Sequence, residues 1–210
     1  PLTERDISEA LALAPLGERS DFDLEPDARA PGTRAAQDRP LRPAAVLCGL
    51  VPREAGLAVV LTRRAAHLRH HAGQISFPGG KVEPWDASAS SAALREAEEE
   101  IGLRPADVRL LGHYDPYTTV TRFRVTPFVG VVDPGWRARL DPNEVDAVFE
   151  APLDFLMDPR NCERRHYERE GERRHFYAMP WGEHMIWGAT AGMLKGLSDR
   201  IRRLGRVVVE

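Results

Sequence analysis

Residues 79–103 read GGKVEPWDASASSAALREAEEEIGL and are the most informative stretch of the chain. A Gly-Gly pair opens it, and Glu96, Glu99 and Glu100 follow at spacings of three and four residues. On an α-helix such spacings place the three carboxylates on one face. Because like charges this close destabilise a helix, the pattern predicts that a divalent cation sits over them.

The helix that carries these carboxylates is expected over residues 87–101. Its apolar positions recur at helical spacing and are Ala93, Leu94, Ala97 and Ile101. Gly102 is a typical residue at which a helix stops. The same helical geometry places Arg95 beside Glu99 for an i to i+4 ion pair and turns Glu98 toward solvent.

A solvated acidic helix face is the alternative reading of the three glutamates. Most acidic runs on helices are no more than that, but here an acidic cluster lies near a helix C-terminus, where the helix dipole opposes it. The preceding Gly-Gly turn also permits close approach of the backbone to an ion, since no Cβ intervenes. These features favour a site for Mg²⁺ or Mn²⁺, which prefer oxygen ligands.

Strands outnumber helices along the rest of the chain, and the long acidic helix lies between strands. A mixed sheet with helices on both faces, and so an α/β fold, is expected. Pro127 cannot donate a backbone hydrogen bond, so part of the strand 123–132 is expected at a sheet edge or at a bulge. The expected strands are 44–50 and 56–64 as a hairpin, 74–77, 108–114, 123–132, the start of 144–156, and 164–168 with 173–179 as an antiparallel pair. The further helices are expected at 3–13 and 184–205.

Composition limits the classes of function. The 210 residues suffice for one sizeable domain. A formal net charge of −3 argues against a nucleic-acid backbone as partner. Cys48 and Cys162 are expected as buried free thiols. No run is apolar enough to cross a bilayer, and residues 1–10 lack the pattern of a signal peptide, so we expect a cytoplasmic protein without a membrane partner.

The segment 79–103 resembles the signature of the Nudix hydrolases. That signature has Gly, five residues, Glu, seven residues, then Arg-Glu, an apolar residue, any residue, Glu-Glu, any residue, Gly and an apolar residue. Its second half is matched in full by Arg95, Glu96, Ala97, Glu99, Glu100, Gly102 and Leu103, and Gly80 matches its opening glycine. Asp86 stands where the first glutamate belongs, and eight residues separate it from Arg95. Asp86 therefore either takes the family role or caps the helix.

A narrower resemblance lies in residues 61–80, LTRRAAHLRHHAGQISFPGG. This stretch is similar to the motif of the coenzyme A diphosphatase branch of Nudix proteins: Leu-Thr-x-Arg, a second Arg, Gly, then Phe-Pro-Gly-Gly. We match it to Leu61, Thr62, Arg63, Arg69, Gly73, Phe77, Pro78, Gly79 and Gly80. Weaker similarity extends over most of the chain after residue 44, so a Nudix domain is expected over 44–210, after a helix and loosely structured arm at 1–43.

The resemblance implies a Nudix-type α/β/α sandwich and a Mg²⁺- or Mn²⁺-dependent diphosphatase. Its substrate would be coenzyme A or an acyl derivative, cut to 3′,5′-ADP and 4′-phosphopantetheine. The expected metal ligands are Glu96, Glu99, Glu100 and the Gly80 carbonyl. The acids expected to take part in catalysis are Glu96, Glu99 and Glu144, the last from a late loop. The expected substrate contacts are Arg63, Arg69, Phe77 and Gly79.

Two other functions stay open at this point. The same chemistry could act on another nucleoside diphosphate derivative, such as an ADP-sugar or a damaged nucleotide. The Asp86 substitution also leaves open a nucleotide-binding module without turnover. The sequence does not decide whether the chain forms a homodimer.

Overall fold

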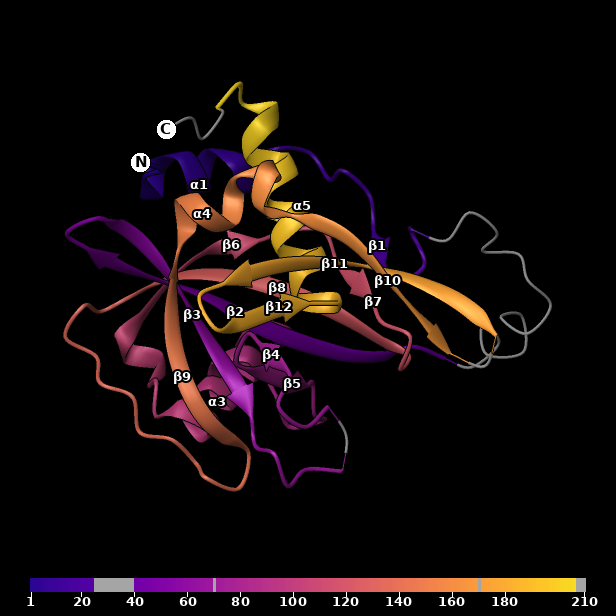
Figure 1. Cartoon of the computed structure of the whole chain (residues 1–210). Coiled ribbons are helices and arrows are strands. Elements are labelled where there is room, and N and C mark those ends of the chain that lie inside the picture. The colour runs from indigo at the N-terminus through magenta and orange to yellow at the C-terminus, as the bar shows by residue number, and fades with distance from the viewer. Residues whose placement is uncertain (25–39, 70, 170, 207–210) are drawn as a thin grey trace.

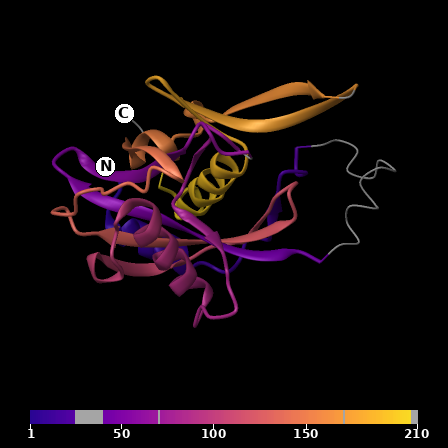
Figure 2. The ribbon, with the colours of Figure 1, turned by 90° about the horizontal axis from the view of Figure 1, so that it is seen from below.

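A computed structural model describes residues 1–24, 40–69, 71–169 and 171–206 (Figure 1). A large mixed sheet, nine-stranded within these ranges, runs through the molecule. Helix α3 (Ala89–Ile101) covers one face, and helices α1 (Glu4–Ala12), α4 (Leu153–Met157) and α5 (Ala189–Arg203) lie on the other (Figure 2). The mixed α/β class with helices on both faces is confirmed.

Strand β2 (Arg42–Arg53) is the centre of the large sheet. It pairs in parallel with β8 (Phe123–Val132) and antiparallel with β3 (Gly56–Arg64), the expected hairpin partner. Strand β9 (Val145–Pro152) pairs antiparallel with β3 and leads into α4, as expected. The shorter strands are β1 (Arg19–Ser20), β4 (Ile75–Ser76), β5 (Gly79–Lys81), β6 (Val108–His113) and β7 (Tyr117–Thr118). The order is β1-β7-β8-β2-β3-β4, with β5 on β2, β6 on β8 and β9 on β3.

The two faces of β2 build the two halves of the core. Ala45 and Leu47 pack with the apolar side of α3, while Cys48 and Leu50 belong to the cluster that includes α1 and α5. This alternation follows from the period of two in a strand. The central strand therefore fixes where α3 lies, and α3 carries the acidic residues.

Pro127 does not lie on an edge strand, contrary to the sequence-based expectation. It pairs in register with Val46 of β2 inside β8. On its other side, β7 ends its pairing at Val125 and β6 begins at Phe128. The proline carbonyl still accepts a hydrogen bond from the Tyr114 amide at 3.2 Å. A central strand thus tolerates this proline because it stands between two successive partner strands.

A second, three-stranded sheet packs against α5. It consists of β10 (Glu163–Arg169), β11 (Glu172–Trp181) and β12 (His184–Trp187), all antiparallel. The β10–β11 pair confirms the expected hairpin. The expected helix over 184–205 is wrong at its start, because residues 184–187 pair with β11 and α5 begins only at Ala189.

The N-terminal helix is part of the main core. Ile7 and Ala10 of α1 are fully buried in the cluster shared with α5. Residues 19–20 then add β1 to β7 in parallel. Residues 25–39, the middle of the expected arm, lie outside the described residues.

Both cysteines are free thiols, as expected. Cys48 is fully buried, and burial raises its pKa to about 12. Cys162 is only half-buried, and burial raises its pKa to about 11. Within the described ranges, no helix combines the length and the apolar character that a membrane span requires.

Candidate metal centre

Helix α3 begins at Ser88, which caps it. The Ser88 hydroxyl accepts a hydrogen bond from the Ser91 amide, and the Ser91 hydroxyl bonds back to the Ser88 amide. Asp86 is therefore not the helix cap, and that alternative is wrong. The helix ends at Gly102, whose φ of 67° lies in the left-handed region that glycine adopts without strain.

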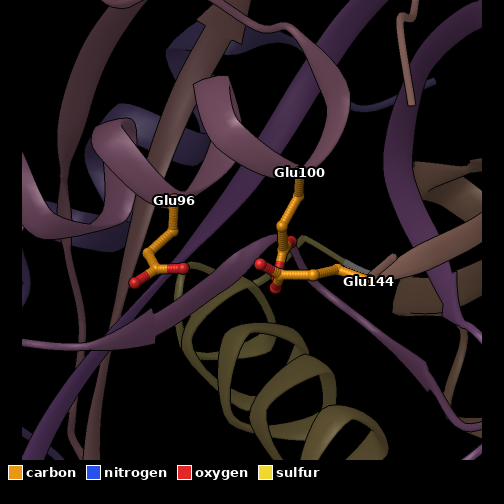
Figure 3. Close-up of side chains that lie close together, drawn as sticks. All are labelled: Glu96, Glu100 and Glu144. Atoms are coloured by element: carbon orange, nitrogen blue, oxygen red, sulfur yellow. The ribbon is translucent and has the colours of Figure 1, made fainter. Parts of the chain in front are cut away.

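The packing of α3 sets the direction of its acidic residues. Ala93, Ala97 and Ile101 are fully buried, while Glu98 is exposed as expected. With the apolar stripe held against the sheet, Glu96 and Glu100 point toward the turn before β5 and toward the loop before β9 (Figure 3).

Three carboxylates converge at this point. Ligand oxygens of Glu96, Glu100 and Glu144 all lie within 4.8 Å of one another. Two come from adjacent turns of α3, and the third comes from the turn that precedes β9 (Figure 3). Glu144 is held by its backbone, since its carbonyl accepts a bond from the Ala65 amide at 2.9 Å and its amide donates to Asp141 at 3.0 Å.

Gly79 and Gly80, expected as a turn, instead begin strand β5 and lie close to the same cluster. The Gly79 amide donates to Glu100 Oε2 at 3.3 Å. A Cβ on Gly80 would lie only 2.6–2.8 Å from the carboxylate atoms of Glu96. A Cβ on Gly79, whose φ is 154°, would meet the Ala45 carbonyl at 2.4 Å. Glycine at 79 thus allows β5 to lie close against β2, and glycine at 80 leaves room for the Glu96 carboxylate of α3.

Burial and mutual repulsion make the carboxylates of this cluster harder to ionise. Burial raises the pKa of Glu100 to about 8, and the neighbouring charges of Glu144 and Glu96 add to that rise. Burial also raises the pKa of Glu96, although its bond to Arg95 opposes the change. A buried carboxylate is costly to ionise unless an opposite charge accompanies it.

Arg95 forms hydrogen bonds with three carboxylates in and beside the cluster. It binds both oxygens of Asp86, at 2.9 and 3.0 Å, and donates to Glu96 Oε1 at 2.9 Å and Glu99 Oε2 at 3.1 Å. It also reaches the Lys81 carbonyl at 3.2 Å. These hydrogen bonds, with Asp86 first, raise the pKa of the Arg95 guanidinium, and the Arg95 bond lowers the pKa of Asp86.

Glu99 lies outside the group of converging oxygens. Its side chain is 53% exposed, and its carboxylate pairs with Arg95 as the helical spacing predicted. The structure thus brings together two of the three helix glutamates expected as ligands, and adds Glu144 to them. A role for Glu99 with a second ion stays a prediction.

Arg63 and Arg64 follow each other at the end of β3 but lie in different surroundings. Arg63 is 43% exposed and pairs with Asp146 at 2.8 Å. Arg64 Nε is buried without a hydrogen-bond partner among the described residues, and the Arg64 charge lowers the pKa of Glu100. Of these two neighbouring arginines, Arg64 is therefore the one whose charge affects Glu100. The spacing Leu-Thr-x-Arg already indicates it, because one residue stands between Thr62 and Arg64.

The other expected substrate contacts fall in two places. Arg69 is exposed on the loop after β3, where a substrate can reach it. Phe77 is only 2% exposed and belongs to the main core cluster. Because the residue is buried in that cluster, its contact with substrate stays a prediction.

The donor set fits a hard divalent cation. Carboxylate oxygens on adjacent helical turns match the ligand preference of Mg²⁺ and Mn²⁺, and a cation bound there would oppose the rise in the pKa values of Glu96 and Glu100. Cysteine and histidine are absent from this group. The Gly80 backbone lies against Glu96, so its carbonyl remains a candidate ligand.

Comparisons with known proteins bear on the family of this chain. An Escherichia coli (strain K12) protein described as "Uncharacterized Nudix hydrolase NudL" is 42% identical over 161 residues, which cover 76% of this chain and 83% of that protein. A MutT protein structure from Methanosarcina mazei Go1 aligns with a TM-score of 0.46 at 20% identity, over 80% of this chain and 98% of that one. The family model of the NUDIX domain matches residues 40–173. With a family match over more than half of its length and a relative at this level of identity, the chain belongs to the Nudix hydrolases.

Proposed function

We propose that this protein hydrolyses coenzyme A or an acyl-coenzyme A at its diphosphate, with Mg²⁺ or Mn²⁺, to give 3′,5′-ADP and a 4′-phosphopantetheine. The observation that carries the chemistry is the convergence of Glu96, Glu100 and Glu144 within 4.8 Å. As a Nudix hydrolase, the chain acts on nucleoside diphosphate derivatives. The choice of coenzyme A within that class is our inference.

Glu96 and Glu100 would hold the cation, with the Gly80 carbonyl beside them. When bound, the cation neutralises phosphate oxygens and lowers the pKa of a coordinated water. Glu144 comes from a different element than the two helix ligands, and its carboxylate reaches the same cluster. We assign to Glu144 the proton of the attacking water.

The reaction itself is a simple displacement. The water oxygen bonds to one phosphorus of the diphosphate, the bridging P–O bond breaks, and the phosphate of the other half leaves. The water proton passes to the Glu144 carboxylate. Arg64, which lacks a hydrogen-bond partner at Nε among the described residues, can donate to the phosphate oxygens as their charge changes.

The motif in residues 61–80 supports coenzyme A as the substrate. Coenzyme A carries a 3′-phosphate in addition to its diphosphate, so it needs a cation beyond those at the metal centre. Arg69 is exposed on the loop between β3 and β4 and is free to meet that phosphate. The match of residues 61–80 to the motif of the coenzyme A branch points in the same direction.

The test is product analysis by mass spectrometry with coenzyme A, with and without Mn²⁺. We expect 3′,5′-ADP and 4′-phosphopantetheine only with the metal. Glu100→Gln should abolish the products, and Glu98→Gln, on the solvent side of the same helix, should not. Equal turnover of ADP-ribose would reassign the substrate class, and tight binding of coenzyme A without products would indicate a binding module.

A further inference from the structure

Strand β10 is an exposed edge of the small sheet. Its only strand partner among the described residues is β11. Every residue from Glu163 to Glu168 is exposed. Figures 1 and 2 both show the β10–β11 hairpin reaching past α5, away from the large sheet. Such an edge presents unpaired backbone groups to any strand that approaches it.

The side chains of this edge are charged, which ordinarily discourages pairing. Their charges, however, are self-complementary about His166: residues 163–168 read Glu-Arg-Arg-His-Tyr-Glu. If a second β10 runs antiparallel with His166 opposite its own copy, Arg164 faces Glu168 of that copy and Arg165 faces Tyr167. Two-fold symmetry makes each of these pairs twice.

The register is decided by charge. In an antiparallel pair, residues that stand opposite each other have their side chains on the same face of the sheet. Because side chains alternate along a strand and the two strands are identical, opposed positions must differ by an even number. The two-fold axis therefore passes through a residue that stands opposite its own copy. Centring on Arg165 places that arginine against itself. Centring on Tyr167 replaces both Arg–Glu pairs with His–Glu pairs and places position 165 opposite position 169, both of them arginine. Only the His166 centre opposes unlike charges without a like-charge pair, and opposed unlike charges stabilise neighbouring strands.

One face of the hairpin supports the same arrangement. Tyr167 and Trp187 are 43% and 36% exposed, and Phe176 lies between them, with ring centroids 5.9 Å and 5.3 Å from theirs. Arg165 stands across from Phe176 on this face. In the paired arrangement the partner's Tyr167 covers the Arg165 guanidinium, which favours an arginine–aromatic contact.

We propose that β10 is a self-complementary edge through which two copies of this chain form an antiparallel, two-fold symmetric dimer centred on His166. The two small sheets would then join into one continuous sheet. The occupant is a second copy because the charge order fits itself, and the surface is separate from the acidic cluster on α3.

The first test is a charge swap followed by sedimentation velocity. Wild type should sediment as a dimer. Arg164→Glu and Glu168→Arg should each sediment as monomers, because each puts like charges opposite one another twice. The double variant Arg164→Glu/Glu168→Arg restores both pairs and should recover the dimer. A monomeric wild type, or a dimer that both single variants leave intact, overturns the proposal.

The second test reads the register directly. His166→Cys, in a Cys162→Ser background, places two thiols opposite each other across the two-fold axis, within disulfide reach. Mild oxidation should give a covalent dimer on a non-reducing gel. Glu163→Cys in the same background is the matched control and should stay uncrosslinked. Equal crosslinking of both, or none at residue 166, contradicts this register even if the protein sediments as a dimer.

Discussion

Arg95 holds Asp86 through two parallel hydrogen bonds, from Nε to Oδ1 at 2.9 Å and from Nη2 to Oδ2 at 3.0 Å. The Asp86 carboxylate is almost fully buried, at 4% exposure. The same guanidinium donates to Glu96 Oε1. Asp86 therefore reaches the metal centre through Arg95, and its side chain, one methylene shorter than glutamate, suffices for that role. The longer loop between Asp86 and α3 leaves this pairing intact.

Asp86→Asn should lower kcat and lower Mn²⁺ affinity about tenfold, as losses of partners that orient ligands commonly do. The reason is that Arg95 loses its charged partner and no longer holds Glu96 in one position. The control is Asp107→Asn, which breaks a comparable two-bond pair with Arg104 on the surface. Manganese titration and steady-state kinetics measure both variants. Equal effects of the two substitutions would show that Asp86 acts only on general stability.

Glu100→Gln should stabilise the metal-free protein at alkaline pH. The folded pKa of Glu100 is about 8, above the ordinary value of 4.5. Ionisation in the folded state is therefore unfavourable: the cost is absent below pH 4.5, grows as the pH rises, and is complete above about pH 8. With EDTA, the Tm of the variant should exceed that of wild type above pH 8 and match it near pH 4.

Added Mn²⁺ should reverse the order of the two Tm values, so that wild type melts above Glu100→Gln. Mn²⁺ should raise the Tm of wild type and not that of Glu100→Gln, because binding to the folded state alone stabilises it. Glu98→Gln, exposed on the same helix, should behave as wild type throughout. A wild-type Tm that does not respond to Mn²⁺ would remove Glu100 and its neighbours from the ligand set.

The helix and its acidic face were predictable because the signals are local. Ala93, Ala97 and Ile101 mark the buried side, and Gly102 marks the end. Glu99 was harder to place, since it shares the acidic face by spacing alone. Arg95 binds its carboxylate at 3.1 Å and keeps it in solvent. Helical geometry defines a face, but only the neighbouring partners decide which acids on it converge.

Contacts between distant segments were predictable only in part. Glu144 was a candidate as a late acid, yet its meeting with Glu100 depends on the pairing of β9 with β3.

The error at the start of the last helix has a local cause. Met185 and Trp187 are exposed around buried Ile186, a period of two that indicates a strand. Gly188, with φ of 65°, marks the break before α5.

Arg64→Ala should reduce kcat/KM by about tenfold to a hundredfold, the range expected for a lost hydrogen bond to a charged phosphate. The partner-free Nε and the electrostatic contact with Glu100 place Arg64 at the site. Arg63→Ala is the matched control and should retain activity, because Arg63 pairs with Asp146 on the surface. A greater loss in the Arg63 variant would reverse this assignment.

Arg69→Ala should raise KM for coenzyme A more than for 3′-dephospho-coenzyme A. Arg69 is exposed on the loop between β3 and β4, and its guanidinium can bind the 3′-phosphate with two hydrogen bonds. Parallel steady-state measurements on the two substrates isolate that phosphate, since the diphosphate is common to both. Equal changes in the two KM values would show that Arg69 does not recognise it.

Gly80→Ala should weaken Mn²⁺ binding while leaving the fold intact. The added methyl carbon would lie 2.6–2.8 Å from the Glu96 carboxylate, so the end of that side chain must move away. The loss of one ligand position should lower Mn²⁺ affinity about tenfold or more. Gly196→Ala in α5 is the control, because its methyl would meet neighbours only at 3.6 Å or beyond. In EDTA, Gly80→Ala should melt as wild type, and Gly196→Ala should melt at the wild-type temperature or above it, because alanine favours a helix interior. Unchanged Mn²⁺ affinity in Gly80→Ala would mean that Glu96 either is not a ligand or binds equally well from another position, and the contact between the glycine turn and the helix would then be one of packing alone.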